Sequence, residues 1–297
     1  MTDRAVTVMG LGPMGRAMVD AFLAEGYEVT VWNRTAAKAD ELVSRGARRA
    51  ATVGEALAAS ELVVLSLTDY DAMYAILGPA TAELSGRVIA NLSSDTPERA
   101  REAAEWLAGH GARQLTGGVQ VPPSGIGNPG SATYYSGPRD VFEAHRQTLE
   151  VLTRADYRGE DPGLAALYYQ LEMNMFWTVM VSWLHTLAVA RTHGITATEF
   201  LPAALKTANV APFLEFYAPR IDAGDHQGDM DRLAMGVASV GHVLHTVRAA
   251  GVDTTLPAAV LDVFRRGMAD GRADQSLTSL VEVFASGAAV ADVDARP

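Results

Sequence analysis

The glycine-rich segment at residues 10–15, Gly-Leu-Gly-Pro-Met-Gly, constrains the fold of this chain more than any other feature. It follows a short apolar run at residues 6–9 and opens an alanine-containing helical segment at residues 16–25. Glycines with this spacing between a strand and a helix are typical of a dinucleotide-binding βα unit. The first glycine permits the sharp turn, the second lets the backbone approach a pyrophosphate, and the third lets helix and strand pack closely. An ordinary tight turn is the alternative. We predict a cofactor site formed by Gly10, Leu11, Gly12, Pro13, Met14 and Gly15.

The first half of the chain continues this alternation of apolar runs and helical segments. A second helix is expected at residues 36–46, and further strands at residues 28–32, 61–66, 88–92, 114–121 and 132–136. A Pro- and Gly-rich loop at residues 122–130 separates the last two strands. Alternating strands and helices require a mostly parallel sheet with right-handed crossovers. We therefore predict a doubly wound Rossmann domain over residues 1–162.

The second half begins with a long apolar segment at residues 163–193, which has no internal proline or glycine. It predicts one helix of about 31 residues, roughly 45 Å long. Its residues 173–190 carry no formal charge and reach the length of a membrane-spanning candidate. Glu172 and Arg191 bracket them and no second such segment exists, so we predict instead a helix that is buried on most sides inside protein. Its length suggests that a second chain packs against it.

The remaining segments are helical in pattern, and helices are expected at residues 198–208, 211–222, 230–250, 255–269 and 276–285. The tail after residue 287 is expected to be disordered. The predicted fold class is thus an α/β Rossmann domain (residues 1–162) and an all-α domain for substrate binding and dimerisation (residues 194–297). A long interdomain helix (residues 163–193) joins them.

Composition excludes several classes of protein. The chain of 297 residues has no cysteine, which excludes disulfides and thiolate chemistry and fits a reducing compartment such as the cytoplasm. No secretory signal precedes the first strand. A net charge of −11 without a basic stripe argues against nucleic acid. No His, Asp or Glu cluster has the spacing of metal ligands, so no metal is expected. No membrane partner is expected either, because the long apolar segment is interpreted as a helix buried inside protein.

Cofactor choice is determined at the end of the second strand. NAD-dependent proteins place an acidic residue there for the ribose hydroxyls. This chain has Trp32, Asn33, Arg34 and Thr35 instead, followed by Lys38. Arg34 can stack on adenine and pair with a 2′-phosphate, and Thr35 and Lys38 can add a donor and a charge. A merely solvated helix start is the alternative; the pattern favours NADPH.

These motifs carry a resemblance over nearly the whole chain. The sequence Trp-Asn-Arg-Thr at residues 32–35 follows the glycine-rich turn, and Asn-Leu-Ser-Ser-Asp-Thr-Pro occupies residues 91–97. Residues 117–122 read Gly-Gly-Val-Gln-Val-Pro, and residues 249–257 read Ala-Ala-Gly-Val-Asp-Thr-Thr-Leu-Pro. Together they resemble the imine reductase and reductive aminase branch of the β-hydroxyacid dehydrogenase superfamily, whose Rossmann domains are like that of 6-phosphogluconate dehydrogenase.

The resemblance implies a homodimer with exchanged helical domains and active sites between one chain's Rossmann domain and the other's helices. It implies hydride transfer from NADPH to the carbon of a C=N bond, and also imine, or ketone and amine, substrates. Further cofactor-binding residues are then expected at Leu67, Asn91, Ser93, Val119 and Val121. Asn91 would orient the nicotinamide ribose, although a loop-capping role is an alternative.

The chain departs from the superfamily at its catalytic positions. Hydroxyacid dehydrogenases carry a catalytic lysine on the interdomain helix, but residues 163–193 contain none. A carbonyl becoming an alkoxide needs such a donor, whereas a lysine beside a cationic iminium would raise the barrier. The loss therefore favours C=N reduction over the alternative, an NADP-dependent β-hydroxyacid dehydrogenase. A non-catalytic NADPH-binding sensor or assembly protein is an alternative of another class.

The usual proton donor is also missing. The family's acidic positions are held by Tyr169 and Trp177, and an indole N–H is too weak an acid to donate a proton. Either Tyr169 is the donor, or the imine arrives protonated, or the substrate is different. Trp177 could attract an iminium by a cation–π contact. We predict Tyr169, Trp177 and Asn91 as catalytic residues.

The substrate pocket is predicted to contain Met173, Phe213 and His242. Met173 shares an apolar stripe with Tyr169, and such a stripe is more often part of a core or an interface than of a ligand pocket. Phe213 could be a core residue, and His242 and the less favoured His245 could be structural. Glu172 is interpreted as an ion-paired dimer contact or, less favoured, a general acid.

Overall fold

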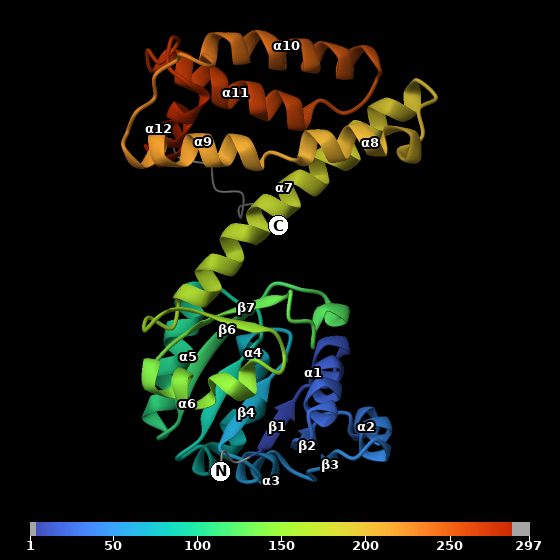
Figure 1. Ribbon diagram of the computed structural model, residues 1–297, viewed down its shortest axis with the longest axis vertical. Coiled ribbons are helices and arrows are strands. Elements are labelled where there is room, and N and C mark those ends of the chain that lie inside the picture. The colour runs from blue at the N-terminus through green and yellow to red at the C-terminus, as the bar shows by residue number, and fades with distance from the viewer. Residues whose placement is uncertain (1–3, 287–297) are drawn as a thin grey trace. The chain divides into compact units, whose positions relative to one another are not determined.

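The computed structural model describes residues 4–286, and the predicted disordered tail lies outside them. The chain forms two compact units, Met1–Asn174 and Met175–Pro297. The division falls within helix α7 (Leu164–Thr192), so this helix contributes residues to both units (Figure 1).

The first unit is built on one eight-stranded sheet with the order β3-β2-β1-β4-β5-β6-β7-β8. All neighbouring strands run parallel except β6 and β7, which confirms the mostly parallel sheet that the sequence predicts. The strands are β1 (Ala5–Met9), β2 (Glu28–Trp32), β3 (Arg48–Arg49), β4 (Leu62–Leu65), β5 (Val88–Asn91), β6 (Arg113–Val119), β7 (Ala132–Ser136) and β8 (Arg154–Gly159). Strands β3 and β8 were not expected, because both lie at sheet edges and lack a continuous apolar run.

Helices connect these strands and cover the sheet. They are α1 (Pro13–Ala24), η1 (Ala36–Ala39), α2 (Asp40–Ser44), α3 (Val53–Ala58), α4 (Tyr70–Leu77), η2 (Gly78–Glu83), α5 (Pro97–Gly109), η3 (Pro123–Gly125) and α6 (Arg139–Leu149). The prediction of a single helix at residues 36–46 was wrong, because a 3-10 turn, η1, precedes α2. Such a turn tightens the start of a helix at the cost of poorer hydrogen bonds. Helix α5 was not predicted, although the sequence marks its start: Thr96 caps the helix and Pro97 is its first residue.

Both faces of the central strands are buried, as a parallel sheet requires. Along β1, Val6 and Val8 belong to the core shared with α1 and α6, whereas Met9 belongs to the core shared with α3, α4 and α5. Their side chains are fully buried. The carboxyl ends of β1, β4 and β5 are therefore held rigidly from both sides.

Within its described residues, 175–286, the second unit contains helices and one isolated β-bridge, between Gln227 and Gln275. After α7 come α8 (Ala197–Ala208), α9 (Ala211–Asp222), α10 (Leu233–Ala249), α11 (Thr255–Ala269), η4 (Leu277–Ser279) and α12 (Leu280–Ala285). Helices α10 and α11 pack side by side (Figure 1). Helix α10 begins three residues later than expected, because Asp231 accepts hydrogen bonds from the Ser276 hydroxyl (3.1 Å) and the Leu277 N–H (2.6 Å) and so holds its segment outside the helix.

Helix α7 is long and apolar enough to cross a membrane by length and composition, which is weak support for such a role. Only 11% of its most apolar window is buried. The prediction of a helix buried on most sides is therefore wrong for the single chain. The exposed side chains include Met175 (55%), Trp177 (62%) and Leu184 (56%), because no other described element of the chain covers that face.

Candidate functional site

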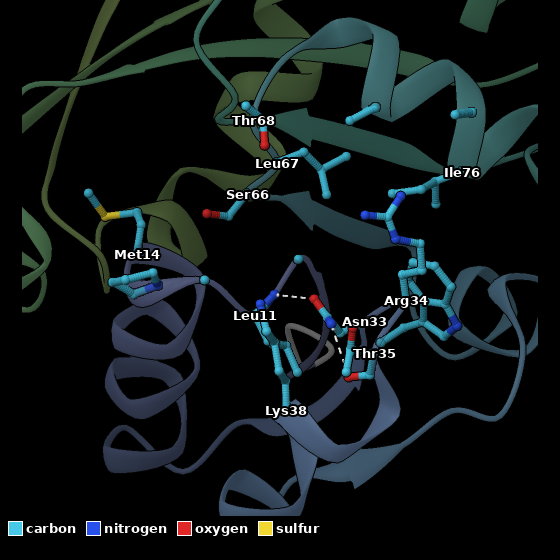
Figure 2. Close-up of a pocket in the computed structure, with 16 residues that line it drawn as sticks. Leu11, Met14, Asn33, Arg34, Thr35, Lys38, Ser66, Leu67, Thr68 and Ile76 are labelled. Carbon is cyan, nitrogen blue, oxygen red and sulfur yellow. Dashed lines mark hydrogen bonds between the residues drawn. The ribbon is translucent and has the colours of Figure 1, made fainter.

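A cleft of about 400 Å³ opens at the carboxyl ends of β1, β2 and β4 (Figure 2). Strands β1 and β4 are neighbours, and the chain moves from β1 first to β2 on one side and later to β4 on the other. Such a switch point is where doubly wound folds bind dinucleotides. The cleft is lined by Gly10, Leu11, Gly12, Pro13, Met14, Trp32, Asn33, Arg34, Thr35, Lys38, Ser66, Leu67, Thr68, Ala72, Ala75 and Ile76.

The glycines of the turn have three different surroundings. Gly10 adopts a φ of +95°, and a Cβ there would lie 2.2 Å from the Ser66 carbonyl oxygen. A Cβ on Gly15 would lie 1.9 Å from the Gly10 carbonyl oxygen. A Cβ on Gly12 would meet nothing within 4 Å, so this glycine borders open space inside the cleft. Gly10 and Gly15 therefore serve packing, whereas Gly12 keeps the backbone accessible to a ligand.

The start of α1 provides an anion site beside Gly12. The helix begins at Pro13, and no side chain caps it. Proline suits this first position because its missing N–H has no helical partner to lose. The N–H groups of the first turn and the helix dipole attract phosphate oxygens. This geometry fits a pyrophosphate.

Asn33 links the glycine-rich turn to the segment after β2. Its Oδ1 accepts a hydrogen bond from the Leu11 N–H (2.9 Å), and its Nδ2 donates to the Thr35 carbonyl oxygen (3.0 Å), as the dashed lines in Figure 2 show. The carboxamide therefore fixes the distance between the two parts of the cleft that would hold the pyrophosphate and the adenosine ribose.

Positive charge enters the cleft from the segment after β2. Arg34 and Lys38 line it and are exposed, and no Asp or Glu lies among its lining residues. The Arg16 guanidinium donates to the Lys38 carbonyl oxygen (3.3 Å) and forms an ion pair with Glu41, which holds this segment against α1. Two cations without a neighbouring carboxylate favour a phosphate over a free ribose hydroxyl pair.

The ends of β4 and β5 are tied to each other. The Leu67 N–H donates to the Ser93 hydroxyl (3.1 Å), and the Ser93 N–H donates to Asn91 Oδ1 (3.1 Å). Asn91 is fully buried, and its Nδ2 contacts Met73 Sδ at 3.3 Å. Leu67 lines the cleft, but Asn91 and Ser93 do not. In this structure Asn91 performs the loop-capping alternative, and its contact with the nicotinamide ribose stays a prediction.

Helix α7 approaches the end of β6 closely because β6 lacks a side chain there. A Cβ on Gly118 would lie 2.9 Å from Tyr169 Cβ and 2.8 Å from the Ala165 carbonyl oxygen. Tyr169 is thereby seated, half-buried, beside the carboxyl end of β6. Val119 and Val121 lie in the same strand end and loop, outside the residues that line the cleft, and they remain predicted nicotinamide contacts.

Glu172 lies one turn after Tyr169 and contacts two neutral groups. Its Oε2 accepts from Gln120 Nε2 (2.6 Å), and its Oε1 accepts from the Tyr134 hydroxyl. Burial, with this hydrogen bond, raises the pKa of the Tyr134 phenol above its usual range. The prediction that Glu172 is ion-paired at a dimer contact is not met within the chain, since both partners are uncharged.

The other predicted pocket residues are distributed over both units. Met173 is half-buried on the first unit's part of α7. Trp177 and Phe213 are each 62% exposed in the second unit, and His242 is an exposed residue of α10. All four remain predicted substrate contacts.

Several cleft residues were not predicted: Trp32, Ser66, Thr68, Ala72, Ala75 and Ile76. Most of them follow β4, and Leu67 was the one residue predicted in that segment. A signal was available, because the carboxyl ends of adjacent parallel strands meet at the same edge of a sheet. The residues after the third apolar run therefore had to face the glycine-rich turn.

Comparison with known proteins is consistent along the whole chain. Residues 5–159 match the family model of the NAD binding domain of 6-phosphogluconate dehydrogenase. Residues 161–286 match the model of the NADPH-dependent reductive aminase-like C-terminal domain. An NADPH-dependent reductive aminase of Aspergillus oryzae is 30% identical over 290 residues, which cover 96% of this chain and 98% of that protein.

Solved structures agree with these matches. An imine reductase from Bacillus cereus is 65% identical, with a TM-score of 0.88 over 95% of this chain and 99% of that one. A reductive aminase from Aspergillus terreus, in complex with NADPH and ethyl-5-oxohexanoate, is 33% identical. Its TM-score is 0.90 over 94% of this chain and 99% of that one.

Proposed function

This chain belongs to the NADPH-dependent reductive aminase-like family, and from that premise we propose that it is an NADPH-dependent imine reductase. It transfers hydride to the carbon of a C=N bond and forms an amine. One observation carries the proposal: the cleft that fits a phosphorylated dinucleotide belongs to a chain 65% identical to an imine reductase over nearly its full length.

The residues of the cleft fit NADPH from one end to the other. The open backbone at Gly12 and the uncapped start of α1 would hold the pyrophosphate. Arg34, Thr35 and Lys38 would hold the 2′-phosphate and the adenine. NADPH, when bound, supplies the hydride. The protein must exclude water, orient the C=N carbon, and provide a proton to nitrogen when the imine arrives neutral.

The groups on α7 favour a C=N substrate over a C=O substrate. Residues 163–193 contain no lysine to stabilise a developing alkoxide, and Glu172 adds a negative charge instead. Tyr169, seated against β6 by Gly118, is the proposed proton donor for neutral imines. Trp177, on the same helix, is proposed to attract the cationic form through its ring face.

The protein acts as a homodimer in this proposal. Several apolar side chains of α7, among them Met175, Val181 and Leu184, are each more than half exposed in the single chain. An apolar stripe of this length is stable in water only when another surface covers it. We propose that the helices of a second copy cover it and complete the substrate pocket.

Two assays, run in parallel, test the proposed reaction. In the first, NADPH oxidation is followed with 2-methyl-1-pyrroline; in the second, NADP reduction is followed with 3-hydroxyisobutyrate. We expect turnover with the imine alone. Turnover with the hydroxy acid alone would favour the β-hydroxyacid dehydrogenase alternative. Tight NADPH binding without turnover of either compound would favour a non-catalytic NADPH-binding protein.

A further inference from the structure

Glu172 is a half-buried carboxylate whose charge no cation neutralises within residues 4–286. Both of its hydrogen bonds come from neutral donors, the Gln120 amide and the Tyr134 hydroxyl. Neutral donors satisfy lone pairs but leave the full negative charge in place. A carboxylate partly removed from water without a cation is costly, so its retention needs a reason.

The nearest arginine does not supply the missing charge. The Arg158 guanidinium stacks over the rings of Tyr134 (4.3 Å) and Tyr168 (4.5 Å) and pairs with Asp156 at 2.8 Å. Asp156 also pairs with the Arg154 guanidinium at 3.8 Å. Neither arginine forms an ion pair with Glu172 among the described residues, so the Glu172 carboxylate has no cation in direct contact.

The position of this carboxylate relates it to the reacting end of the cofactor. A dinucleotide in a doubly wound fold extends across the switch point along the carboxyl ends of the strands. The adenine half would lie at β1 and β2, where Arg34 and Lys38 are, and the nicotinamide half would extend towards β4, β5 and β6. Gln120, the partner of Glu172, directly follows β6, and Tyr169 lies one helical turn before Glu172.

We propose that the Glu172 carboxylate is the counter-charge for the cationic iminium form of the substrate, so that this site selects charged C=N groups over neutral ones. The inference rests on the proposed imine reductase function and deepens it. It also addresses the absence of an acid at Trp177: a fixed negative charge stabilises an imine that arrives protonated. Because hydride transfer removes the positive charge, the carboxylate stabilises the substrate most before transfer, and its effect falls mainly on KM.

The test compares a permanently charged and a neutral substrate that share one ring system and differ by an N-methyl group. The pair is N-methyl-3,4-dihydroisoquinolinium and 3,4-dihydroisoquinoline, assayed at a pH well above the pKa of the neutral imine. In Glu172→Gln, which retains the volume and can keep both contacts if one hydrogen bond reverses its direction, we expect KM for the cation to rise about tenfold. KM for the neutral imine and both kcat values should change less than about twofold.

A binding measurement tests the same charge without turnover. Calorimetry with NADP and the protonated amine N-methyl-1,2,3,4-tetrahydroisoquinoline should show its Kd rising about tenfold in Glu172→Gln. Glu172→Asp, which retains the charge, should preserve most of the affinity. Glu160→Gln is the matched control, because it removes one exposed carboxylate from the same unit and should leave selectivity for the cation unchanged.

Tyr134→Phe separates the counter-charge from a structural role. It removes one hydrogen bond to Glu172 but leaves the carboxylate, so selectivity for the cation should persist. Equal KM changes for both substrates in Glu172→Gln, or loss of selectivity in Tyr134→Phe, would overturn the proposal. If the wild-type protein reduces neither substrate, the proposed function fails; if it reduces both and Glu172→Gln treats them alike, only the counter-charge fails.

Discussion

The two units of this chain differ in how far their apolar side chains are buried. In the first unit both faces of the sheet are covered, and the large hydrophobic side chains it exposes are Val43, Leu167, Tyr168 and Leu171. Three of these four belong to α7. In the second unit, exposed apolar side chains occur on every helix from α7 to α12, and the largest core cluster of described residues consists of Leu233, Leu280 and Val283.

The difference shows which part of the molecule is complete by itself. The first unit buries its own core and contains all the residues that line the cleft at the ends of β1, β2 and β4, so the geometry of this cleft is set within one unit. The second unit, with α7, leaves apolar surface that must be covered from outside, which implies that its stability depends on a partner surface. Cofactor recognition and assembly are therefore separable by mutation.

The largest expected effect is on assembly. Leu184→Arg places a charge on the exposed face of α7, where it costs nothing in an isolated chain but is buried unpaired in a dimer. An unpaired buried charge costs about 3 kcal/mol or more, which is over a hundredfold in the dissociation constant. Light scattering should show dimers for the wild-type protein and monomers for the variant. Val43→Arg, in the first unit, should remain dimeric; a monomeric wild-type protein would contradict the proposal.

The next effect concerns proton transfer. Tyr169→Phe removes the proposed donor from the first unit's part of α7 without changing its packing against Gly118. General acid catalysis of this kind contributes about a hundredfold or more, so kcat for weakly basic imines should fall by about that factor. Permanently charged iminium substrates need no proton and should be reduced at the wild-type rate. A matching loss on both substrate types would exclude Tyr169 as the donor.

A smaller effect is expected at the adenosine end of the cleft. Arg34→Asp replaces a cation by an anion beside the predicted 2′-phosphate and should weaken NADPH binding by about 2 kcal/mol, roughly thirtyfold. NADH binding should change much less. Fluorescence titration measures both, with Arg154→Asp, an exposed change on β8, as the control. Unchanged NADPH affinity in Arg34→Asp would remove this residue from the site.

The glycine-rich turn separates binding from folding within the first unit. Gly12→Ala adds a methyl group into open space, so the melting temperature should hold while NADPH affinity falls about tenfold, or 1.4 kcal/mol. Gly15→Ala forces a Cβ against the Gly10 carbonyl oxygen and should destabilise the protein by about 1–3 kcal/mol. A Gly12→Ala protein with normal affinity would show that the pyrophosphate lies elsewhere.

The smallest effect is a pH dependence of the first unit. Burial lowers the pKa of His145 below its usual range, against a weaker opposing influence of Glu61 at 3.9 Å. As pH falls through about 6.5, the unfolded chain takes up a proton that the folded chain resists, so stability decreases. Between neutral and acidic pH, the melting temperature of His145→Gln should fall less than that of the wild-type protein. His193→Gln, at an exposed position, should retain it.

The sequence by itself determined the elements whose causes are local. The strand, glycine turn and helix at the N-terminus follow from the backbone freedom of Gly10 and the small size of Gly15, and the structure has them where they were expected. The residues predicted from Gly10 to Met14, together with Asn33, Arg34, Thr35 and Lys38, line one cleft, and they could be selected because each group lies close together in sequence. Helix α7 was predicted within a residue or two at each end, because a long run without proline or glycine has few alternatives.

The tertiary structure alone decided what depends on contacts between distant residues. Asn91 is fully buried and contacts Met73 and Ser93, and no local pattern encodes that burial. The hydrogen-bond partners of Glu172 within the chain, Gln120 and Tyr134, lie 52 and 38 residues away, and no local pattern points to them. The sequence suggested that a second chain packs against α7, but apolar composition specifies only that a helix must be covered and not which surface covers it.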